Sequence, residues 1–152
     1  MILATLCYVK HNGCTLMVHR NKKANDIHEG KWNGLGGKFE VGETPEECVV
    51  REVLEESGLT IGNPKYCGLL VFTNFKDNDW YVFVFTVNEF TGVLIDSPEG
   101  KLEWIPDKKL LELNLWPSDH IFFPWIDDGK LFSAKFDYEG DEMRGYSVFF
   151  HS

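Results

Sequence analysis

The chain has 152 residues, of which 43% are hydrophobic and 26% are charged, and these values predict one globular domain over residues 1–152. Its 15 basic and 24 acidic residues give a formal net charge of -9, which disfavours nucleic-acid polymers and membranes as partners. A small phosphorylated substrate remains compatible with this charge if metal ions supply the positive charge. The four cysteines show no C-x-x-C spacing, which argues against a zinc site or a disulfide framework and favours reduced thiols in a cytoplasmic protein. The sequence leaves the oligomeric state open.

Runs rich in β-branched and aromatic residues predict strands at residues 2–10, 14–19, 66–75, 80–88, 101–105, 131–138 and 145–150. The apolar start of the chain lacks a basic n-region and a cleavage site, so it predicts a first strand rather than a signal peptide. No apolar run approaches the roughly 18 residues that a membrane-spanning helix needs. Asp77, Asn78 and Asp79 separate two of the runs and predict a hairpin turn.

Residues 44–57 carry the clearest helix pattern. Thr44 is a suitable N-cap, Pro45 suits the first helical position, and Glu47 completes a capping box with Thr44. Gly58 is placed to end the helix in a left-handed conformation. Apolar residues at helical spacing form a stripe that is expected to face a sheet: Val49, Val50, Val53 and Leu54.

A second helix is expected over about 119–127, beginning at Ser118 or Asp119, and residues 108–113 predict a short helical turn. The chain therefore has few helices among many strands, and the two do not alternate. This pattern predicts an α+β fold with a mixed or antiparallel sheet flanked by helices.

Three carboxylates share one face of the first helix, because Glu52, Glu55 and Glu56 are spaced at i, i+3 and i+4. Like charges at these spacings destabilise a helix, and a bound Mg²⁺ or Mn²⁺ ion would remove the repulsion. The alternative is a solvated acidic face. The glycine-rich loop at 34–37, just ahead of the helix, would let backbone approach a ligand closely, or it is an ordinary turn.

Residues 37–59 fill every specified position of the Nudix box, G-x5-E-x7-R-E-U-x-E-E-x-G-U, where U is aliphatic. The matching residues are Gly37, Glu43, Arg51, Glu52, Val53, Glu55, Glu56, Gly58 and Leu59. The chain is identified as a member of the Nudix hydrolases, which cleave a nucleoside diphosphate linked to another group. The resemblance implies an α/β/α sandwich, with Glu52, Glu55 and Glu56 as metal ligands and the Gly37 carbonyl as a further ligand. It also implies that Arg51 and Glu43 brace the loop and the helix.

The resemblance extends beyond the box to residues 32–38 and 116–119, which are similar to MutT-like 8-oxo-dGTP diphosphatases and their animal counterparts. It implies that Glu99 is an extra metal ligand and that Arg20 meets the phosphates. The loop over 21–29, next to Arg20, looks longer than in the animal enzymes. Residues implied to bind the substrate are Thr5, Arg20, Asn33, Gly36, Gly37, Lys38, Trp116 and Asp119. The animal enzymes have two adjacent aspartates after Trp-Pro, whereas Ser118 stands at the first position here, which bears on the range of oxidised bases accepted.

The residue chemistry agrees with a purine ligand. Trp116 offers a flat apolar wall, Asn33 offers both donor and acceptor groups, and Asp119 offers two acceptors. Each residue also has a structural interpretation: a core tryptophan, a turn asparagine and the N-cap of the second helix.

The sequence therefore predicts metal-assisted hydrolysis of an oxidised purine nucleoside triphosphate to the monophosphate and pyrophosphate, with Glu56 or Glu55 accepting the proton of the attacking water. One alternative is a Nudix hydrolase that acts on ADP-ribose, a dinucleoside polyphosphate or a capped RNA end. Another is a non-catalytic Nudix module that binds nucleotides. Either alternative keeps the same fold, so activity on a panel of nucleotides would separate them.

Overall fold

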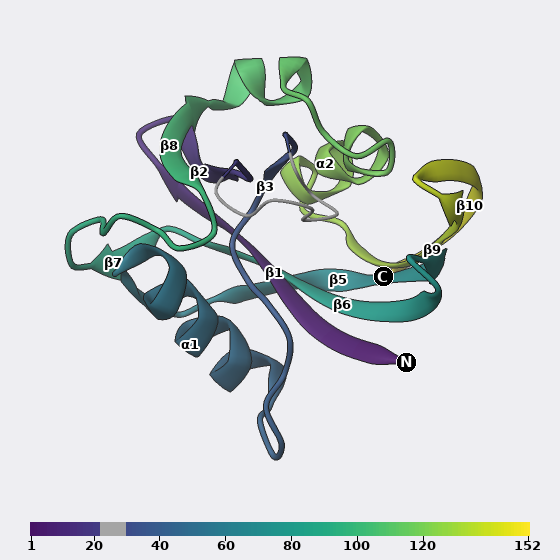
Figure 1. The fold of residues 1–152 in the computed structure, drawn as a ribbon, viewed down its shortest axis with the longest axis horizontal. Helices are drawn as coiled ribbons and strands as arrows, with labels where there is room; N and C mark the ends of the chain where they lie inside the picture. Colours follow the sequence, from purple (N-terminus) through teal and green to yellow (C-terminus); the bar gives the residue numbers. More distant parts are fainter. Residues whose placement is uncertain (22–29) are drawn as a thin grey trace.

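The computed structural model describes residues 1–21 and 30–152, so the expected long loop at 21–29 lies outside the described residues except for Asn21. Figure 1 shows a twisted sheet with helices packed against it. The helical elements are α1 (Pro45–Ser57), the 3-10 helix η1 (Asp107–Glu112) and α2 (Asp119–Asp127). The strands are β1 (Ile2–His11), β2 (Cys14–His19), β3 (Trp32–Asn33), β4 (Thr60–Gly62), β5 (Lys65–Phe75), β6 (Asn78–Val87), β7 (Glu89–Thr91), β8 (Lys101–Pro106), β9 (Leu131–Gly140) and β10 (Glu142–His151).

The main sheet is mixed. Within the described residues its strand order is β10-β9-β5-β6-β1-β2-β3, with β8 also paired to β2. Strands β1 and β6 run parallel, as do β5 and β9, while the other pairs are antiparallel. A separate small sheet joins β4 to β7. The expected α+β class with a mixed sheet is thus confirmed.

Helix α1 begins and ends as the sequence predicts. The Thr44 hydroxyl accepts from the Glu47 backbone, the Glu47 carboxylate accepts from the Thr44 backbone, and Gly58 adopts φ 83° at the C-terminus. The expectation that Leu54 faces the sheet is wrong, because its side chain is 47% exposed. The buried stripe instead continues from Val49 and Val53 to Glu56, at i, i+4 and i+7.

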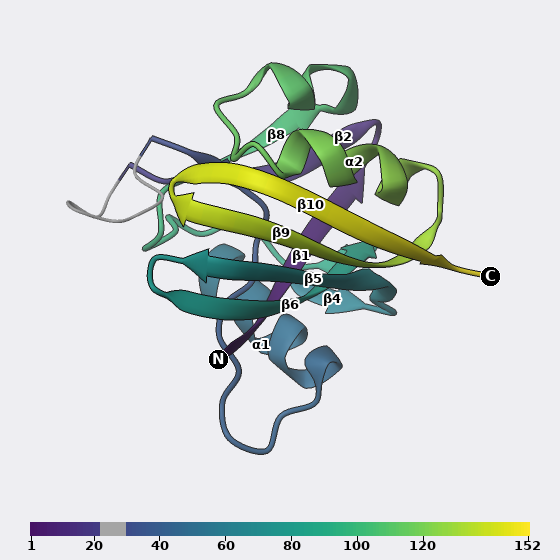
Figure 2. The same cartoon turned by 90° about the vertical axis from the view of Figure 1, so that its right-hand side faces the viewer.

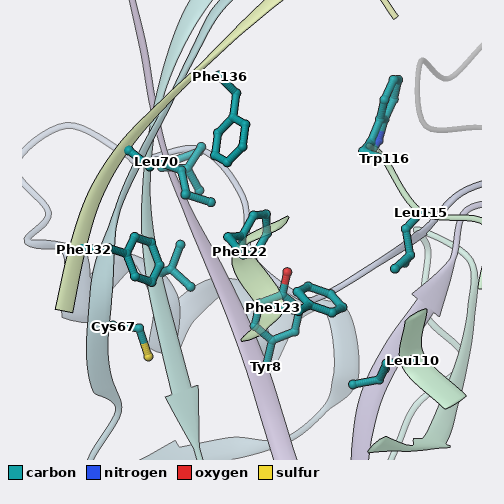
Figure 3. Close-up of a cluster of buried hydrophobic side chains, with 14 of the residues drawn as sticks. Tyr8, Cys67, Leu70, Leu110, Leu115, Trp116, Phe122, Phe123, Phe132 and Phe136 are labelled. Atoms are coloured by element: carbon teal, nitrogen blue, oxygen red, sulfur yellow. The ribbon is translucent and has the colours of Figure 1, made fainter. Parts of the chain in front are cut away.

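The sheet carries one apolar cluster on each face. The face covered by α1 packs Val49 and Val53 of the helix against aliphatic residues of β1 and β2. The opposite face, covered by α2, is strongly aromatic, and Tyr8 of β1 lies 5.0 Å from the Phe123 ring. Figure 2 shows α1 and α2 on opposite sides of the sheet, and Figure 3 shows Trp116 at the edge of the aromatic cluster. The two covered faces make the sandwich that the resemblance implies.

The remaining expected elements are present with shifted ends. All the expected strand runs form strands, and residues 108–113 fall largely in η1. The hairpin between β5 and β6 turns at Lys76 and Asp77, which have φ 51° and 64°, so Asn78 and Asp79 belong to β6 rather than to the turn. The two- and three-residue strands β3, β4 and β7 were not expected. Among the described residues, no helix is both long and apolar enough to span a bilayer.

Candidate active site

A cavity of about 580 Å³ lies between β1, the glycine loop ahead of α1 and the segment that leads into α2. It brings together all the predicted substrate-binding residues and three predicted metal-binding glutamates. These residues are Thr5, Arg20, Asn33, Gly36, Gly37, Lys38, Glu52, Glu56, Glu99, Trp116 and Asp119. The lining does not include Arg51, the predicted bracing residue, or Glu55, a predicted metal ligand and candidate base.

The glycine loop runs alongside β1 and is bonded to it. The Thr5 backbone N–H donates to the Gly37 carbonyl over 2.9 Å, and Leu35 and Cys7 exchange two backbone bonds. A Cβ on Gly36 would collide with the Thr5 carbonyl, and Gly36 also has φ 136°. A Cβ on Gly37 would lie 2.5 Å from Glu52 Oε2. Glycine at these two positions therefore allows the loop to lie between β1 and the carboxylates of α1.

Glu56 is buried at the inner end of the carboxylate cluster. It is 5% exposed and accepts a hydrogen bond from the Gly36 backbone N–H over 3.3 Å. Burial, followed by the nearby charges of Glu52 and Glu99, raises its pKa to about 9. Three carboxyl groups from two segments of the chain thus repel one another in one cavity.

Arg51 braces the glycine loop against α1 from outside the cavity. Its guanidinium donates to Glu43 over 2.7 and 2.9 Å, to Glu52 over 2.8 Å and to the Lys38 carbonyl over 3.1 Å. The hydrogen bonds from Arg51 lower the pKa of Glu43 to about 2. This geometry supports the bracing role that the resemblance implies, and that role stays a prediction.

Two predicted metal ligands are held by arginines. Glu55 is 56% exposed and accepts from Arg51 over 3.3 Å, while Glu99 pairs with Arg20 at 3.1 Å. Within residues 1–21 and 30–152, no three acidic, histidine or cysteine side chains are arranged closely enough to hold a metal ion. The ion pairs of Glu55 and Glu99 explain this absence, because each pair turns a carboxylate toward a guanidinium group instead of toward the other carboxylates.

The residues nevertheless fit a divalent cation. Glu52, Glu56 and Glu99 line one cavity, and burial together with the charges of Glu52 and Glu99 raises the pKa of Glu56 to about 9, which favours its protonated form at neutral pH. A bound dication would replace that proton, since it reverses the electrostatic effect of neighbouring carboxylates. The Gly37 carbonyl already accepts from Thr5, so its predicted role as a ligand stays a prediction.

The other end of the cavity is suited to a flat heterocycle. Trp116 is 6% exposed and packs edge-on against Phe75 at 4.9 Å, so it belongs to the core and to the cavity wall at once. Asn33 lies in β3, paired with Val18, and its Nδ2 is buried without a hydrogen-bond partner among the described residues. An unpaired buried donor is costly, so this end of the cavity favours a ligand that presents an acceptor.

Asp119 is a second buried polar residue of the cavity lining. Its Oδ2 accepts from the Trp116 backbone N–H over 3.0 Å, and burial raises its pKa to about 7. It is not the N-cap of α2, because Ser118 holds that position without a side-chain capping bond. The carboxyl group therefore remains available to a ligand.

Sequence reasoning missed the aromatic wall of the cavity. Phe72, Phe75, Trp80 and Tyr138 come from β5, β6 and β9 and line the same space. Trp80 also lies under the Lys38 ammonium group at 5.5 Å. Their aromatic character marks these residues as core in the sequence, but nothing local says which of them border a cavity.

A family model of the NUDIX domain matches residues 3–126. The chain belongs to the Nudix family. It is 32% identical over 142 residues to the oxidized purine nucleoside triphosphate hydrolase of Danio rerio, covering 93% of this chain and 89% of that protein. The mouse protein of the same name is 32% identical over 128 residues, covering 83% and 82%. A crystal structure of a MutT protein from Bacillus halodurans superposes with a TM-score of 0.88 at 31% identity and covers 97% of both chains.

This Nudix protein is a pyrophosphohydrolase with the fold of its MutT structural neighbours. Members of the family generally use divalent metal ions and act on small nucleotide substrates. The complete box, together with the cavity that it borders, argues against a module that has lost its catalytic carboxylates.

Proposed function

We propose that this Nudix hydrolase converts oxidised purine nucleoside triphosphates, with 8-oxo-dGTP preferred, into the monophosphate and pyrophosphate. Such an activity would remove damaged nucleotides before they are incorporated into DNA. The observation that carries the proposal is that one cavity is lined both by carboxylates and by groups suited to a purine. The relatives named oxidized purine nucleoside triphosphate hydrolase support the same substrate class.

Glu52, Glu56 and Glu99 would hold Mg²⁺ or Mn²⁺ at the phosphate end. Such an ion supplies positive charge to the phosphate chain and lowers the pKa of a water molecule bound to it. Of the two candidate bases, Glu56 is favoured over Glu55, because Glu56 lines the cavity, whereas Glu55 is half exposed, paired with Arg51 and outside the lining. Arg51 fixes Glu52 and the loop, and Lys38 and Arg20 contribute the cationic side chains of the lining.

The base would lie against Trp116 and Phe75, with its polar edge toward Asn33 and Asp119. Oxidation at C8 converts N7 of guanine from an acceptor into a donor. A carboxylate that accepts this new N–H distinguishes the oxidised base from the normal one. A contact of this kind is worth about 1–3 kcal/mol, which is roughly ten- to two-hundredfold in kcat/KM.

Pyrophosphate release from a nucleotide panel tests the proposal. The panel contains 8-oxo-dGTP, dGTP, ADP-ribose and a dinucleoside polyphosphate, and 8-oxo-dGTP is expected to have the highest kcat/KM. Asp119→Ala should remove most of the preference for 8-oxo-dGTP over dGTP, mainly through KM. Glu139→Gln, an exposed change on β9, is the matched control for loss of a carboxylate. Higher kcat/KM on ADP-ribose or on the dinucleotide would refute the proposed substrate.

A further inference from the structure

Ser118 and Tyr138 form a buried pair of hydroxyl groups in the cavity lining. Ser118 is 1% and Tyr138 3% exposed, and their oxygens lie 2.9 Å apart. The Ser118 backbone N–H donates to Tyr138 Oη over 3.4 Å. The Tyr138 ring is held edge-on against Phe75 at 5.1 Å and Trp116 at 6.3 Å. Packing and hydrogen bonds together therefore fix the pair in position.

The pair has one hydrogen more than it can use. Two hydroxyl groups carry two hydrogens, and the bond between them uses one. Whichever oxygen donates, the hydrogen bonds of the described residues contain no acceptor for the second hydrogen. A buried donor left unpaired costs free energy, so a ligand in the cavity is expected to supply an acceptor. Asn33 Nδ2 in the same lining is also buried and has no partner in the described part of the chain, which reinforces this demand for acceptors.

The neighbouring carboxyl group indicates which acceptor this is. Asp119 follows Ser118 directly, and its Oδ2 accepts from Trp116, so Oδ1 can accept from an N–H of the base. An 8-oxoguanine base has ring N–H groups at N1 and N7. The C6 carbonyl lies next to both of them. Whichever of these two N–H groups donates to the Asp119 carboxylate, the C6 carbonyl therefore lies beside that N–H group.

We propose that the Ser118–Tyr138 pair donates a hydrogen bond to the C6 carbonyl of the bound purine and thereby selects 6-oxopurine over 6-aminopurine nucleotides. The inference rests on the proposed function and narrows its substrate class. An amino group at C6 could donate to Ser118 Oγ, but the surplus hydrogen of the pair would then have no acceptor. The loss of one buried hydrogen bond of this kind corresponds to about tenfold in kcat/KM.

The test uses 8-oxo-dITP and 8-oxo-dATP, which both lack a 2-amino group and differ at C6 and in the protonation of N1. The wild type is expected to prefer 8-oxo-dITP by about tenfold or more in kcat/KM. The double variant Ser118→Ala/Tyr138→Phe removes both hydroxyl groups, and it should lower this ratio about tenfold, mainly by raising KM for 8-oxo-dITP. Either single variant leaves one hydroxyl group whose hydrogen can still reach the carbonyl, so it should lower the ratio less. Tyr146→Phe, on exposed β10 and outside the lining, is the matched control and should leave the ratio unchanged.

The outcomes separate this inference from the proposed function. Equal kcat/KM for the two nucleotides in the wild type, or an unchanged ratio in the double variant, overturns the inference and leaves the proposed function in place. Thermal unfolding establishes that each variant is folded, and a structural role alone would not change a ratio between two substrates. If no oxidised purine nucleotide releases pyrophosphate, the proposed function fails and the inference fails with it.

Discussion

Removing the charge of Asp119 is expected to stabilise the fold at neutral and alkaline pH. Burial raises the pKa of this carboxyl group from 3.8 to about 7. Between these two values the folded state binds a proton that the unfolded state has released, so stability falls as pH rises from about 4 to 7. At about 1.4 kcal/mol per pH unit, the loss amounts to about 4 kcal/mol at pH 8 as an upper limit.

Asp119→Asn removes this titration with little change in shape. The amide oxygen can still accept from the Trp116 backbone N–H, which the carboxylate now accepts over 3.0 Å. The variant should therefore match the wild type near pH 4 and exceed its unfolding free energy by about 2–4 kcal/mol at pH 8. The variant should recognise the base less well, because an amide group offers one acceptor oxygen where a carboxylate offers two.

Urea denaturation from pH 4.5 to 8.5, with EDTA present, measures this difference. Glu56 also has a raised pKa, but it is common to both proteins, so its contribution cancels in the difference. The same comparison with Asp137→Asn shows the effect of removing a carboxylate on β9 that lies outside the cavity lining and accepts from the Thr73 hydroxyl. Unfolding free energies that run parallel with pH in wild type and Asp119→Asn would refute the reasoning.

Three further predictions concern the phosphate end. EDTA should abolish turnover and added Mg²⁺ restore it, since the lining is rich in carboxylates; full activity of metal-stripped protein would contradict this. Glu56→Gln should lower kcat at least about a hundredfold while the fold survives, and near-normal kcat would show that Glu56 has no catalytic role. Gly36→Ala should destabilise by more than about 2 kcal/mol because its Cβ meets the Thr5 carbonyl, whereas Gly145→Ala, with open space around it, should be nearly neutral in thermal unfolding.

The sequence predicts the elements of this fold well because their signals are local. The caps of α1 act within a few residues, so Thr44, Glu47 and Gly58 define the helix without reference to the rest of the chain. The exposure of Leu54 could not be predicted in this way. The apolar stripe of a helix is ambiguous at its edges, and here the buried row runs through Val49, Val53 and Glu56.

Glu56 lies on the buried row of α1, and this explains why the apolar pattern of the helix does not predict that row. An apolar residue would be expected there, but the helix buries a carboxyl group against the cavity instead. Functional sites are where local patterns are most often violated. The box motif identifies Glu56 as important, yet its burial and its neighbour Glu99 follow from tertiary structure. The same holds for Phe75 and Tyr138, which reach the cavity from strands far apart in the sequence.

The charge balance of the cavity determines how it can bind a nucleoside triphosphate. Of the described residues in its lining, Arg20 and Lys38 are basic, whereas Glu52, Glu56, Glu99 and Asp119 are acidic. Arg20 is paired with Glu99, so part of that positive charge is already neutralised. Even with Glu56 protonated, the acidic side chains offset the charge of Arg20 and Lys38, so the cavity would offer no net positive charge to a triphosphate that enters without cations. On the proposed function, divalent ions would assemble the phosphate site as well as activate water, so EDTA is expected to weaken nucleotide binding together with turnover.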